Sequence, residues 1–295
     1  MSFRMVQTLL AAAAVISLTG CRASSTAPAG AASSSSSAAS ASASSDQKEY
    51  KVLRVGMECA YAPDNWEEST KTDTNIEEEN NPGFYAEGYG VQVAKYISDQ
   101  VGAEMKVVKL SWDGLIEALN NGQIDMIIAG MADTEERKQS VNFSTTYNVK
   151  KTQYQIMLKS DSKYANATQL SDFSGASIPG QKDTLLDTVI DQIPGVNHVS
   201  PVASVPNMID RLNAGTVDGI VIDENSAQAY LQTYPDLKVV SFEDGKGFEL
   251  GFTGACVGLR KSDTDLLDKV NAALASLDTE TRQKMMDTAT AKMPQ

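Results

Sequence analysis

The chain has 295 residues, and 42% of them are hydrophobic, so a sizeable core can form. Its formal net charge is −13, which offers no basic surface for nucleic acid or for anionic lipid. A single histidine excludes a histidine-rich metal site, and the sequence contains no Walker loop, Gly-x-Ser-x-Gly or Cys-x-x-Cys motif. We therefore expect no catalytic residue, no metal and no cofactor.

Residues 1–20 have the pattern of a signal peptide. Arg4 precedes an apolar core over residues 6–18 that is too short to span a bilayer. The core ends in Leu-Thr-Gly-Cys at residues 18–21, which resembles a bacterial lipobox. The resemblance implies that Cys21 is acylated, with palmitate, and becomes the first residue of the mature chain. The alternative is an ordinary signal peptide with Cys21 near the cleavage site by chance.

The segment that follows, residues 21–49, is dominated by Ala and Ser as far as residue 45, and nothing in that stretch can build a core. We expect a disordered tether with a reach on the order of 30 Å. No later apolar run is long enough for a transmembrane helix. A lipid on Cys21 followed by a tether predicts an extracytoplasmic domain anchored to the cell membrane, because two acyl chains suffice for stable attachment.

From residue 51 onward, strand patterns alternate with helix patterns. A polar, acidic loop is expected between the first strand and Gly88. The alternation indicates mainly parallel sheets with ligand groups at the carboxyl ends of the strands. The expected strands are 51–56, 105–110, 154–159, 176–178, 239–242 and 255–260. The expected helices are 91–101, 184–190 with Asp183 as its cap, 205–214, 264–277 and 279–291.

One short unit occurs twice, 93 residues apart. Residues 115–128 read LIEALNNGQIDMII, and residues 208–221 read MIDRLNAGTVDGIV. Each copy combines the end of an amphipathic helix, a Gly suited to a left-handed cap, and a strand that begins with Asp and becomes apolar. Two units of one kind predict two similar lobes with a ligand cleft between them.

We therefore expect an α/β fold of two lobes joined by a two-stranded hinge. Lobe 1 comprises residues 50–149 plus 250–295, and lobe 2 comprises residues 150–249. The hinge segments are expected near Asn148–Gln153 and Gly247–Thr253. A ligand that contacts both lobes would stabilise the closed form.

The loops after the two apolar strands carry complementary charges. Arg137 can grip a carboxylate with its planar guanidinium, on a helix that Asp133 or Thr134 can cap. Asp223 can accept hydrogen bonds from an ammonium, so the pair predicts a clamp for a zwitterion. Two structural alternatives stay open: Arg137 could pair with Asp133 or Glu136 on the surface, and Asp223 could cap a helix.

Six motifs share one order along the chain: VGMECAYAP at 55–63, WDGLI at 112–116, IDMIIAGM at 124–131, ER at 136–137, FS at 143–144 and VDGIVID at 217–223. Together they resemble the polar-amino-acid solute-binding proteins of bacterial ABC importers, from about residue 51 to the C-terminus. The resemblance implies the type II periplasmic-binding-protein fold and a lipoprotein that binds an amino acid.

The resemblance also implies a ligand-binding role for individual residues. It assigns Arg137 to the α-carboxylate of the ligand and Asp223 to the α-ammonium. Glu58 stands where the family usually has Asp and would reach the far end of the ligand, which favours a cationic amino acid. The other implied positions are the aromatic walls Tyr61 and Trp112, the backbone groups of Ala129 and Gly130, and the loop residues Gln181 and Thr184.

Three departures from the family pattern bear on specificity. Ala132, which we include in the ligand-binding site, replaces the usual Ser or Thr, and Asp183 replaces the loop Gly. Asp64 stands where an aromatic residue is common, and the loop over residues 67–87 is long and acidic. We interpret the three glutamates at 77–79 as part of a solvated loop.

We predict the substrate-binding component of an ABC importer, a monomer that delivers a free amino acid to a permease and its ATPase. An extracytoplasmic amino-acid sensor and an enzyme that uses carboxylates on the same fold are the alternatives. The particular amino acid is left open. We favour two free buried thiols at Cys59 and Cys256 over a disulfide, and we expect His198 to be exposed.

Overall fold

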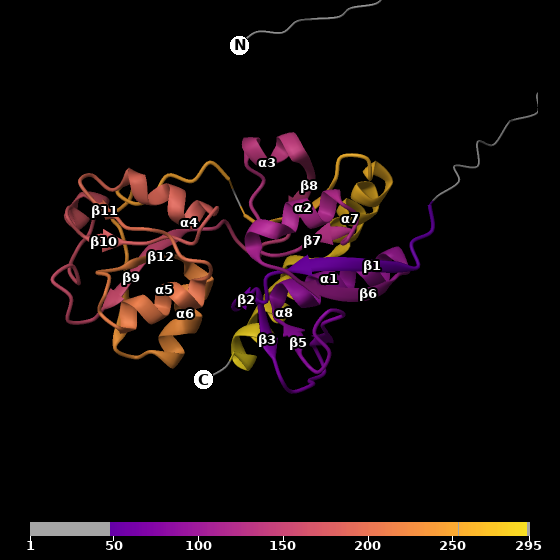
Figure 1. The fold of residues 1–295 in the computed structure, drawn as a ribbon, viewed down its shortest axis with the longest axis horizontal. Coiled ribbons are helices and arrows are strands. Elements are labelled where there is room, and N and C mark those ends of the chain that lie inside the picture. Colours follow the sequence, from indigo (N-terminus) through magenta and orange to yellow (C-terminus); the bar gives the residue numbers. More distant parts are fainter. Residues whose placement is uncertain (1–47, 253, 294–295) are drawn as a thin grey trace, which may run out of the picture. The chain divides into compact units, whose positions relative to one another are not determined.

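A computed structural model describes residues 48–252 and 254–293. The predicted signal peptide, Cys21, nearly all of the tether and Thr253 lie outside these residues. The described chain forms two α/β lobes, each around its own sheet and hydrophobic core (Figure 1). Among the described residues, no helix has both the length and the hydrophobicity needed to cross a membrane.

Lobe 1 is built on a five-stranded sheet with helices on both faces. Leu53 and Val55, on strand β1, share one core with the helices α1 (Tyr89–Val101) and α7 (Thr264–Ser276). Gly56 faces Ile124 and Leu115, where a Cβ atom would lie 2.3 Å from Cδ1 of Ile124 and 3.2 Å from Cδ2 of Leu115. In sheet order the strands are β6 (Glu104–Lys109), β1 (Val52–Met57), β7 (Met126–Ile127), β14 (Cys256–Arg260) and β8 (Val141–Thr146).

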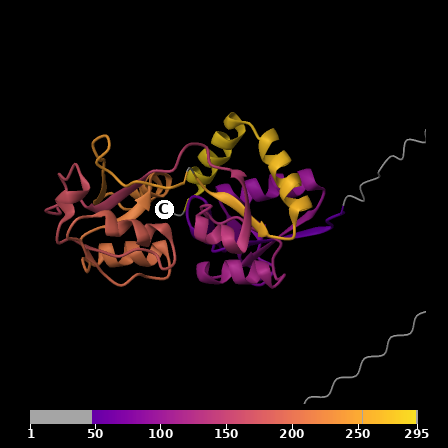
Figure 2. The ribbon, with the colours of Figure 1, turned by 90° about the horizontal axis from the view of Figure 1, so that it is seen from above.

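The helices of lobe 1 include the C-terminal pair, which is far from the first strand in sequence. Figure 2 shows this pair, in yellow, beside the indigo and magenta elements of the sheet. Gln92 of α1 fixes the last helix by donating to the carbonyl of Met285 at 3.1 Å. The helices are α1 (Tyr89–Val101), the 3₁₀ turn η1 (Trp112–Gly114), α2 (Leu115–Asn120), α3 (Glu135–Ser140), α7 (Thr264–Ser276) and α8 (Thr279–Lys292).

The segment expected to be a loop before Gly88 contains a small antiparallel sheet, so that expectation is wrong. Its strands are β2 (Ala60–Tyr61), β3 (Asn65–Glu68), β4 (Ile76–Glu77) and β5 (Tyr85–Glu87), in the order β2-β3-β5-β4. These strands are too short to give a clear alternation of polar and apolar residues. Buried Glu87 stabilises the turn between them, since it accepts hydrogen bonds from the hydroxyls of Thr72 and Thr74.

Lobe 2 holds a three-stranded antiparallel sheet and a two-stranded parallel one. The strands of the first are β12 (Ile220–Asp223), β9 (Tyr154–Lys159) and β13 (Leu237–Val240), and those of the second are β10 (Ser177–Ile178) and β11 (Asn197–His198). The helices are α4 (Leu185–Thr188), α5 (Val205–Asn213) and α6 (Glu224–Thr233), with 3₁₀ turns η2 (Leu170–Phe173) and η3 (Val189–Gln192).

The repeated unit has the same local structure in both lobes. Gly122 follows α2 with φ +76°, and Gly215 follows α5 with φ +67°, so both adopt the predicted left-handed conformation. Asp125 and Asp218 then start the next segment. Each accepts, through Oδ2, a hydrogen bond from a backbone amide of the neighbouring strand β1 or β10, at 3.0 and 2.8 Å. The aspartates thus fix where each repeated segment joins its neighbour.

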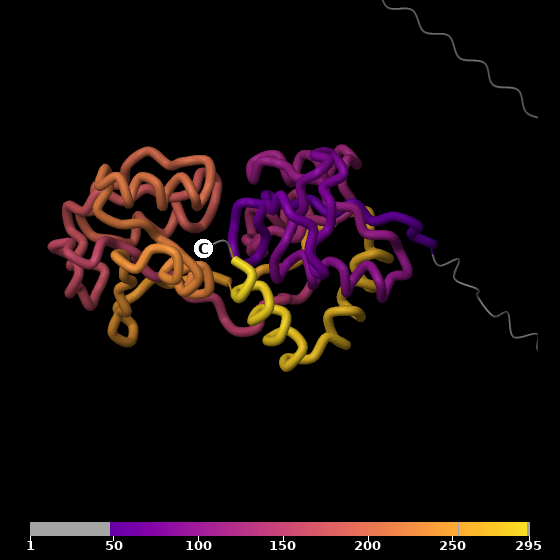
Figure 3. The backbone as a smooth tube through the Cα atoms, turned by 90° about the horizontal axis from the view of Figure 1, so that it is seen from below, coloured from indigo at the N-terminus to yellow at the C-terminus, as the bar shows by residue number. Residues whose placement is uncertain are grey.

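The chain passes between the lobes twice (Figure 3). Residues 147–153 lead from β8 to β9, and the segment after β13 returns to β14. The strands flanking the passages are paired, β8 with β14 and β9 with β13, and each pair must be antiparallel because the chain leaves and re-enters a lobe at one edge. The expectation of mainly parallel sheets therefore holds for β1, β6 and β7 and for the pair β10–β11. It is wrong for β14 and for the three-stranded sheet of lobe 2.

Replacing Gly122 with Ala tests the left-handed helix end. Nothing lies within 4 Å of the position that a methyl group would take at Gly122 or at Gly251, but only Gly122 has a positive φ. Gly122→Ala should cost about 1 kcal/mol of unfolding free energy, a fall of about 2–4 °C in Tm by calorimetry. Gly251→Ala is the control and should leave Tm unchanged. Equal shifts in the two variants would contradict the conformational argument.

Candidate functional site

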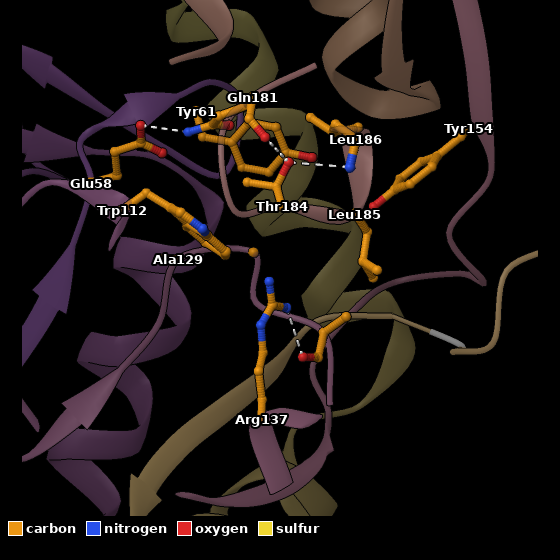
Figure 4. Close-up of a pocket in the computed structure, with 12 residues that line it drawn as sticks. Glu58, Tyr61, Trp112, Ala129, Arg137, Tyr154, Gln181, Thr184, Leu185 and Leu186 are labelled. Carbon is orange, nitrogen blue, oxygen red and sulfur yellow. Dashed lines mark hydrogen bonds between the residues drawn. The ribbon is translucent and has the colours of Figure 1, made fainter. Parts of the chain in front are cut away.

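A pocket with about 360 Å³ of free space lies between the lobes (Figure 4). Nine of the ten predicted ligand-binding residues line it: Glu58, Tyr61, Trp112, Ala129, Gly130, Ala132, Arg137, Gln181 and Thr184. The tenth, Asp223, lines an adjoining cavity that shares Tyr61 and Gly130 with this pocket. The residues that line the pocket are both polar and apolar, as expected for a site that binds a small polar ligand.

Arg137 projects from α3 into the pocket without a carboxylate partner among the described residues. Its Nη1 donates to the carbonyl of Ala132 at 3.0 Å, and its Nη2 donates to the carbonyl of Asp183 in lobe 2 at 3.2 Å. Asp133 pairs with Lys138 instead, so the alternative of a surface salt bridge between Arg137 and Asp133 is wrong. Burial lowers the pKa of Arg137, and the guanidinium still has N–H groups free to bind an anion.

The predicted helix cap for Arg137 is Thr134, whose Oγ1 accepts from the amide of Arg137 at 3.3 Å. The guanidinium stacks on Trp112, with Cζ 5.2 Å from the ring centroid. Trp112 also donates from Nε1 to the carbonyl of Asp183 at 2.9 Å. One backbone carbonyl of lobe 2 therefore accepts hydrogen bonds from both side chains of lobe 1.

Asp183, where the family pattern has Gly, adopts a left-handed backbone conformation with φ +59°. The sequence predicted that Asp183 caps the following helix, and this prediction is wrong. The cap is Thr184, because its Oγ1 accepts from the amide of Leu186 at 3.2 Å and donates to the carbonyl of Gln181 at 2.7 Å. The left-handed turn at Asp183 is what points its carbonyl towards lobe 1.

Glu58 follows β1 directly and is 7% exposed. Its Oε1 accepts from Nε2 of Gln181 at 2.8 Å, a hydrogen bond between the lobes, whereas Oε2 has no partner within the described chain. Burial raises the pKa of Glu58 to about 7, against the hydrogen bond from Gln181, which lowers it, and with a smaller increase due to Asp113. No basic side chain of the described residues forms an ion pair with this buried carboxyl group.

Tyr61 contacts the other lobe through its hydroxyl, which donates to Oδ2 of Asp223 at 2.6 Å. Asp223 is 8% exposed, and its Oδ1 caps α6 by accepting from the amides of Asn225 and Ser226. The alternative of a helix cap is therefore confirmed, but for one oxygen only. The other oxygen faces lobe 1.

Gly130 lines the pocket and packs against Tyr61. A Cβ atom at Gly130 would lie 2.7 Å from Cε1 of the Tyr61 ring. The amide of Gly130 donates to the hydroxyl of Tyr147 at 2.9 Å. Its glycine identity and φ of +72° follow from these contacts.

Three pocket residues were not predicted: Tyr154, Leu185 and Leu186. Tyr154 is the first residue of β9, directly after the first passage between lobes, and its ring pairs with Phe252 on the second passage at 5.9 Å. A signal was present, since the segment before Tyr154 was predicted as a hinge. The two leucines begin α4 immediately after the predicted loop residue Thr184.

The cysteines and the acidic loop also differ in how well the sequence predicted them. Cys59 and Cys256 are both free and buried, as favoured.

The solvated-loop interpretation of residues 77–79 is wrong in part, because Glu78 is 1% exposed and Glu79 pairs with Arg54 at 2.8 Å. Over residues 48–252 and 254–293, no group of three or more His, Cys, Asp or Glu side chains is arranged to hold a metal ion.

His198 is partly buried, not exposed as predicted. Its ring nitrogens each lie 2.9 Å from a carboxylate, Nε2 from Asp187 and Nδ1 from Asp191. Burial lowers the pKa of His198, but the hydrogen bonds to the two carboxylates outweigh this, and the pKa is raised overall. The histidine joins β11 to α4 and η3 and does not line the interlobe pocket.

Known proteins resemble this chain along most of its length. The family model of bacterial extracellular solute-binding proteins, family 3, matches residues 53–289. A probable histidine-binding protein of Campylobacter jejuni is 29% identical over 204 residues, 68% of this chain and 72% of that protein. ABC transporter arginine-binding protein 1 of Escherichia coli is 31% identical over 202 residues, 68% of this chain and 80% of that protein. The solved structure of an ancestral arginine-binding protein bound to arginine is 26% identical, with a TM-score of 0.66 over 82% of this chain and 99% of the other.

The lobes, the pocket between them and these relatives define a type II periplasmic binding protein. The chain belongs to family 3 of the bacterial extracellular solute-binding proteins. The predicted resemblance to polar-amino-acid solute-binding proteins is confirmed.

The raised pKa of Glu58 predicts a pH-dependent stability. A carboxyl whose pKa is about 7 in the folded protein and ordinary in the unfolded chain stabilises the fold below the ordinary value and loses this contribution as pH rises through about 7. Tm measured from pH 5 to pH 8 should therefore fall more for the wild type than for Glu58→Gln. The difference should correspond to about 1–3 kcal/mol. Exposed Glu77→Gln is the control, and parallel curves for wild type and Glu58→Gln would rule the shift out.

Proposed function

We propose that this protein captures a free amino acid between its lobes and delivers it to the permease and ATPase of an ABC importer. The observation that carries the proposal is the interlobe pocket, in which partly buried Arg137 has no carboxylate partner among the described residues. An α-carboxylate would supply the missing charge through a bidentate hydrogen bond. The histidine-binding and arginine-binding relatives are binding proteins, and we propose binding rather than catalysis.

Each end of the ligand has a proposed partner. Arg137 would hold the α-carboxylate, helped by backbone groups of Ala129, Gly130, Ala132 and Thr184. Asp223 would accept from the α-ammonium once the hydroxyl of Tyr61 yields its place on Oδ2. Tyr61 and Trp112 would flank the side chain, and Gln181 would orient Glu58.

The second part of the proposal concerns movement and location. The lobes would divide as residues 50–149 plus 250–295 and 150–249, and they would close by bending near residues 148–153 and 247–253. Ligand-mediated contacts across the cleft would favour the closed form that the permease recognises. Acylated Cys21 and the tether would keep the monomeric protein at the outer side of the cell membrane.

We further propose that the side chain of the ligand is cationic. The unpartnered Oε2 of Glu58 lies at the end of the pocket opposite Arg137 (Figure 4). A guanidinium or ammonium would neutralise this buried carboxylate. The E. coli relative named as an arginine-binding protein is in keeping with this choice.

A thermal-shift series with the L-amino acids tests the binding function. A ligand at a hundred times its Kd should add about 2.7 kcal/mol of stability. Cationic amino acids should raise Tm, and Arg137→Ala should abolish the effect. Lys138→Ala is the matched control, because Lys138 lies on the same helix and pairs with Asp133 and Glu135 outside the pocket. If no amino acid raises Tm, the proposed function is wrong.

Glu58→Gln tests the cationic specificity. Calorimetric titration should show arginine binding weakened roughly tenfold or more, because a charged hydrogen-bond partner is lost, and glutamine binding changed less than about threefold. Glu77→Gln should change neither. Equal losses for the two ligands would end the cationic interpretation while leaving amino-acid binding intact.

A further inference from the structure

Behind Tyr61 lies a second cavity, with about 490 Å³ of free space, that the proposed function does not use. It shares the rings of Tyr61 and Tyr154, both visible in Figure 4, with the amino-acid pocket. Its far wall comes from the start of α1 and from the two passages between the lobes, including Asn148 and Phe252. The two cavities therefore adjoin each other at these rings.

Two carboxylates face this cavity, Asp223 from lobe 2 and Asp64 from lobe 1. Asp64 accepts from Nδ2 of Asn65 at 2.9 Å and, at 3.4 Å, from the hydroxyl of Tyr147. Burial raises the pKa of Asp64 to about 7, and Asp223 adds to the increase while Asn65 opposes it. Of the described residues that line the cavity, none is basic. The cavity therefore has negative charge and no protein cation to balance it.

An independent observation comes from Ser226. It lines the same cavity and is 1% exposed, yet its hydroxyl has no hydrogen-bond partner among the described residues. This hydroxyl is a donor and an acceptor at the wall of the cavity, so a polar ligand group at this position could form a hydrogen bond with it. Aromatic rings of Tyr61, Tyr89 and Tyr154 also border the space. Rings and carboxylates together favour an ammonium.

The position of Asp223 connects the two cavities. In the proposed function, on which this inference rests, Asp223 receives the α-nitrogen of the ligand. A free amino acid would end there and would leave Asp64 and Ser226 unused. A substituent on that nitrogen would instead continue past Tyr61 into the second cavity.

We infer that the second cavity is a subsite for an ammonium group carried on the α-nitrogen of the ligand, so that the substrate class includes dipeptides with a C-terminal cationic residue. The α-carboxylate of the C-terminal residue contacts Arg137, and its side chain contacts Glu58. The amide nitrogen lies near Asp223, and the terminal ammonium reaches Asp64 with a hydrogen bond to Ser226. Asp64, the departure from the aromatic residue common in the family, becomes a specificity-determining residue.

Three probes separate the possibilities: L-arginine, glycyl-L-arginine and N-acetyl-L-arginine. The last two have similar bulk on the α-nitrogen, and only glycyl-arginine carries an ammonium. Calorimetric titration of the wild-type protein should show glycyl-arginine bound at least about tenfold more tightly than N-acetyl-arginine. In Asp64→Asn this preference should disappear, while the affinity for free arginine changes less than about threefold.

Asp64→Asn is nearly isosteric and removes a repulsion with Asp223, so it is expected to fold. Ser226→Ala is the second variant and should weaken glycyl-arginine selectively. Asp99→Asn on the exposed face of α1 is the control and should have no effect. If the wild type binds arginine but does not distinguish the two substituted probes, the subsite is refuted and the proposed function stands. If none of the three probes and no free amino acid binds, both proposals fail.

Discussion

The chain leaves lobe 1 after β8 and re-enters it at β14, and these two strands are hydrogen-bonded neighbours. The amide of Tyr147, on the outgoing passage, donates to the carbonyl of Ala255 on the return at 3.0 Å. The two covalent connections are therefore held together at one edge of the sheet. Each lobe has its own core, and the contacts across the pocket include side-chain hydrogen bonds from Tyr61, Trp112, Arg137 and Gln181. Such contacts can be exchanged for contacts with a ligand without disturbing either core.

The cleft concentrates charges that the protein does not balance. Arg137 is partly buried, stacks on Trp112 and donates only to backbone carbonyls among the described residues, while Glu58 and Asp64 are carboxyl groups with raised pKa. Each costs stability in the ligand-free protein, because a buried charge without an opposite partner is unfavourable. A zwitterionic ligand offers opposite charges at these points. The same electrostatic deficit that weakens the fold therefore favours binding.

Local signals in the sequence were sufficient for much of the fold. Gly122 and Gly215 both end a helix in the left-handed conformation. The aspartate that follows each glycine accepts a hydrogen bond from a backbone amide of a neighbouring strand, so both copies of the motif have the same local structure. Strand direction in lobe 2 was not predictable in this way, since it depends on where the chain crosses between lobes. The sheet formed by β2 to β5 was missed because strands of two to four residues carry too little periodicity.

The sequence likewise predicted some residues of the candidate site and missed others. Nine residues predicted from the sequence line one pocket, although their roles stay predictions. Tyr154 was missed because its position depends on the passage before β9, and the partners of His198 because they lie on other elements. For Asp64, the sequence indicated only an unusual residue. Its proximity to Asp223 comes from the folding of two distant segments against each other.

Tyr61 is the shared wall of two cavities, and Gly130 is the reason that it can stand there. Its ring lies where any side chain at residue 130 would be, and its hydroxyl reaches the opposite lobe at Asp223. The ring of Tyr61 thus separates the two cavities, and its hydroxyl connects the lobes through the hydrogen bond to Asp223. In the proposed function, Arg137 and Glu58 would select the charges of the ligand, whereas the position of the Tyr61 ring would limit its length.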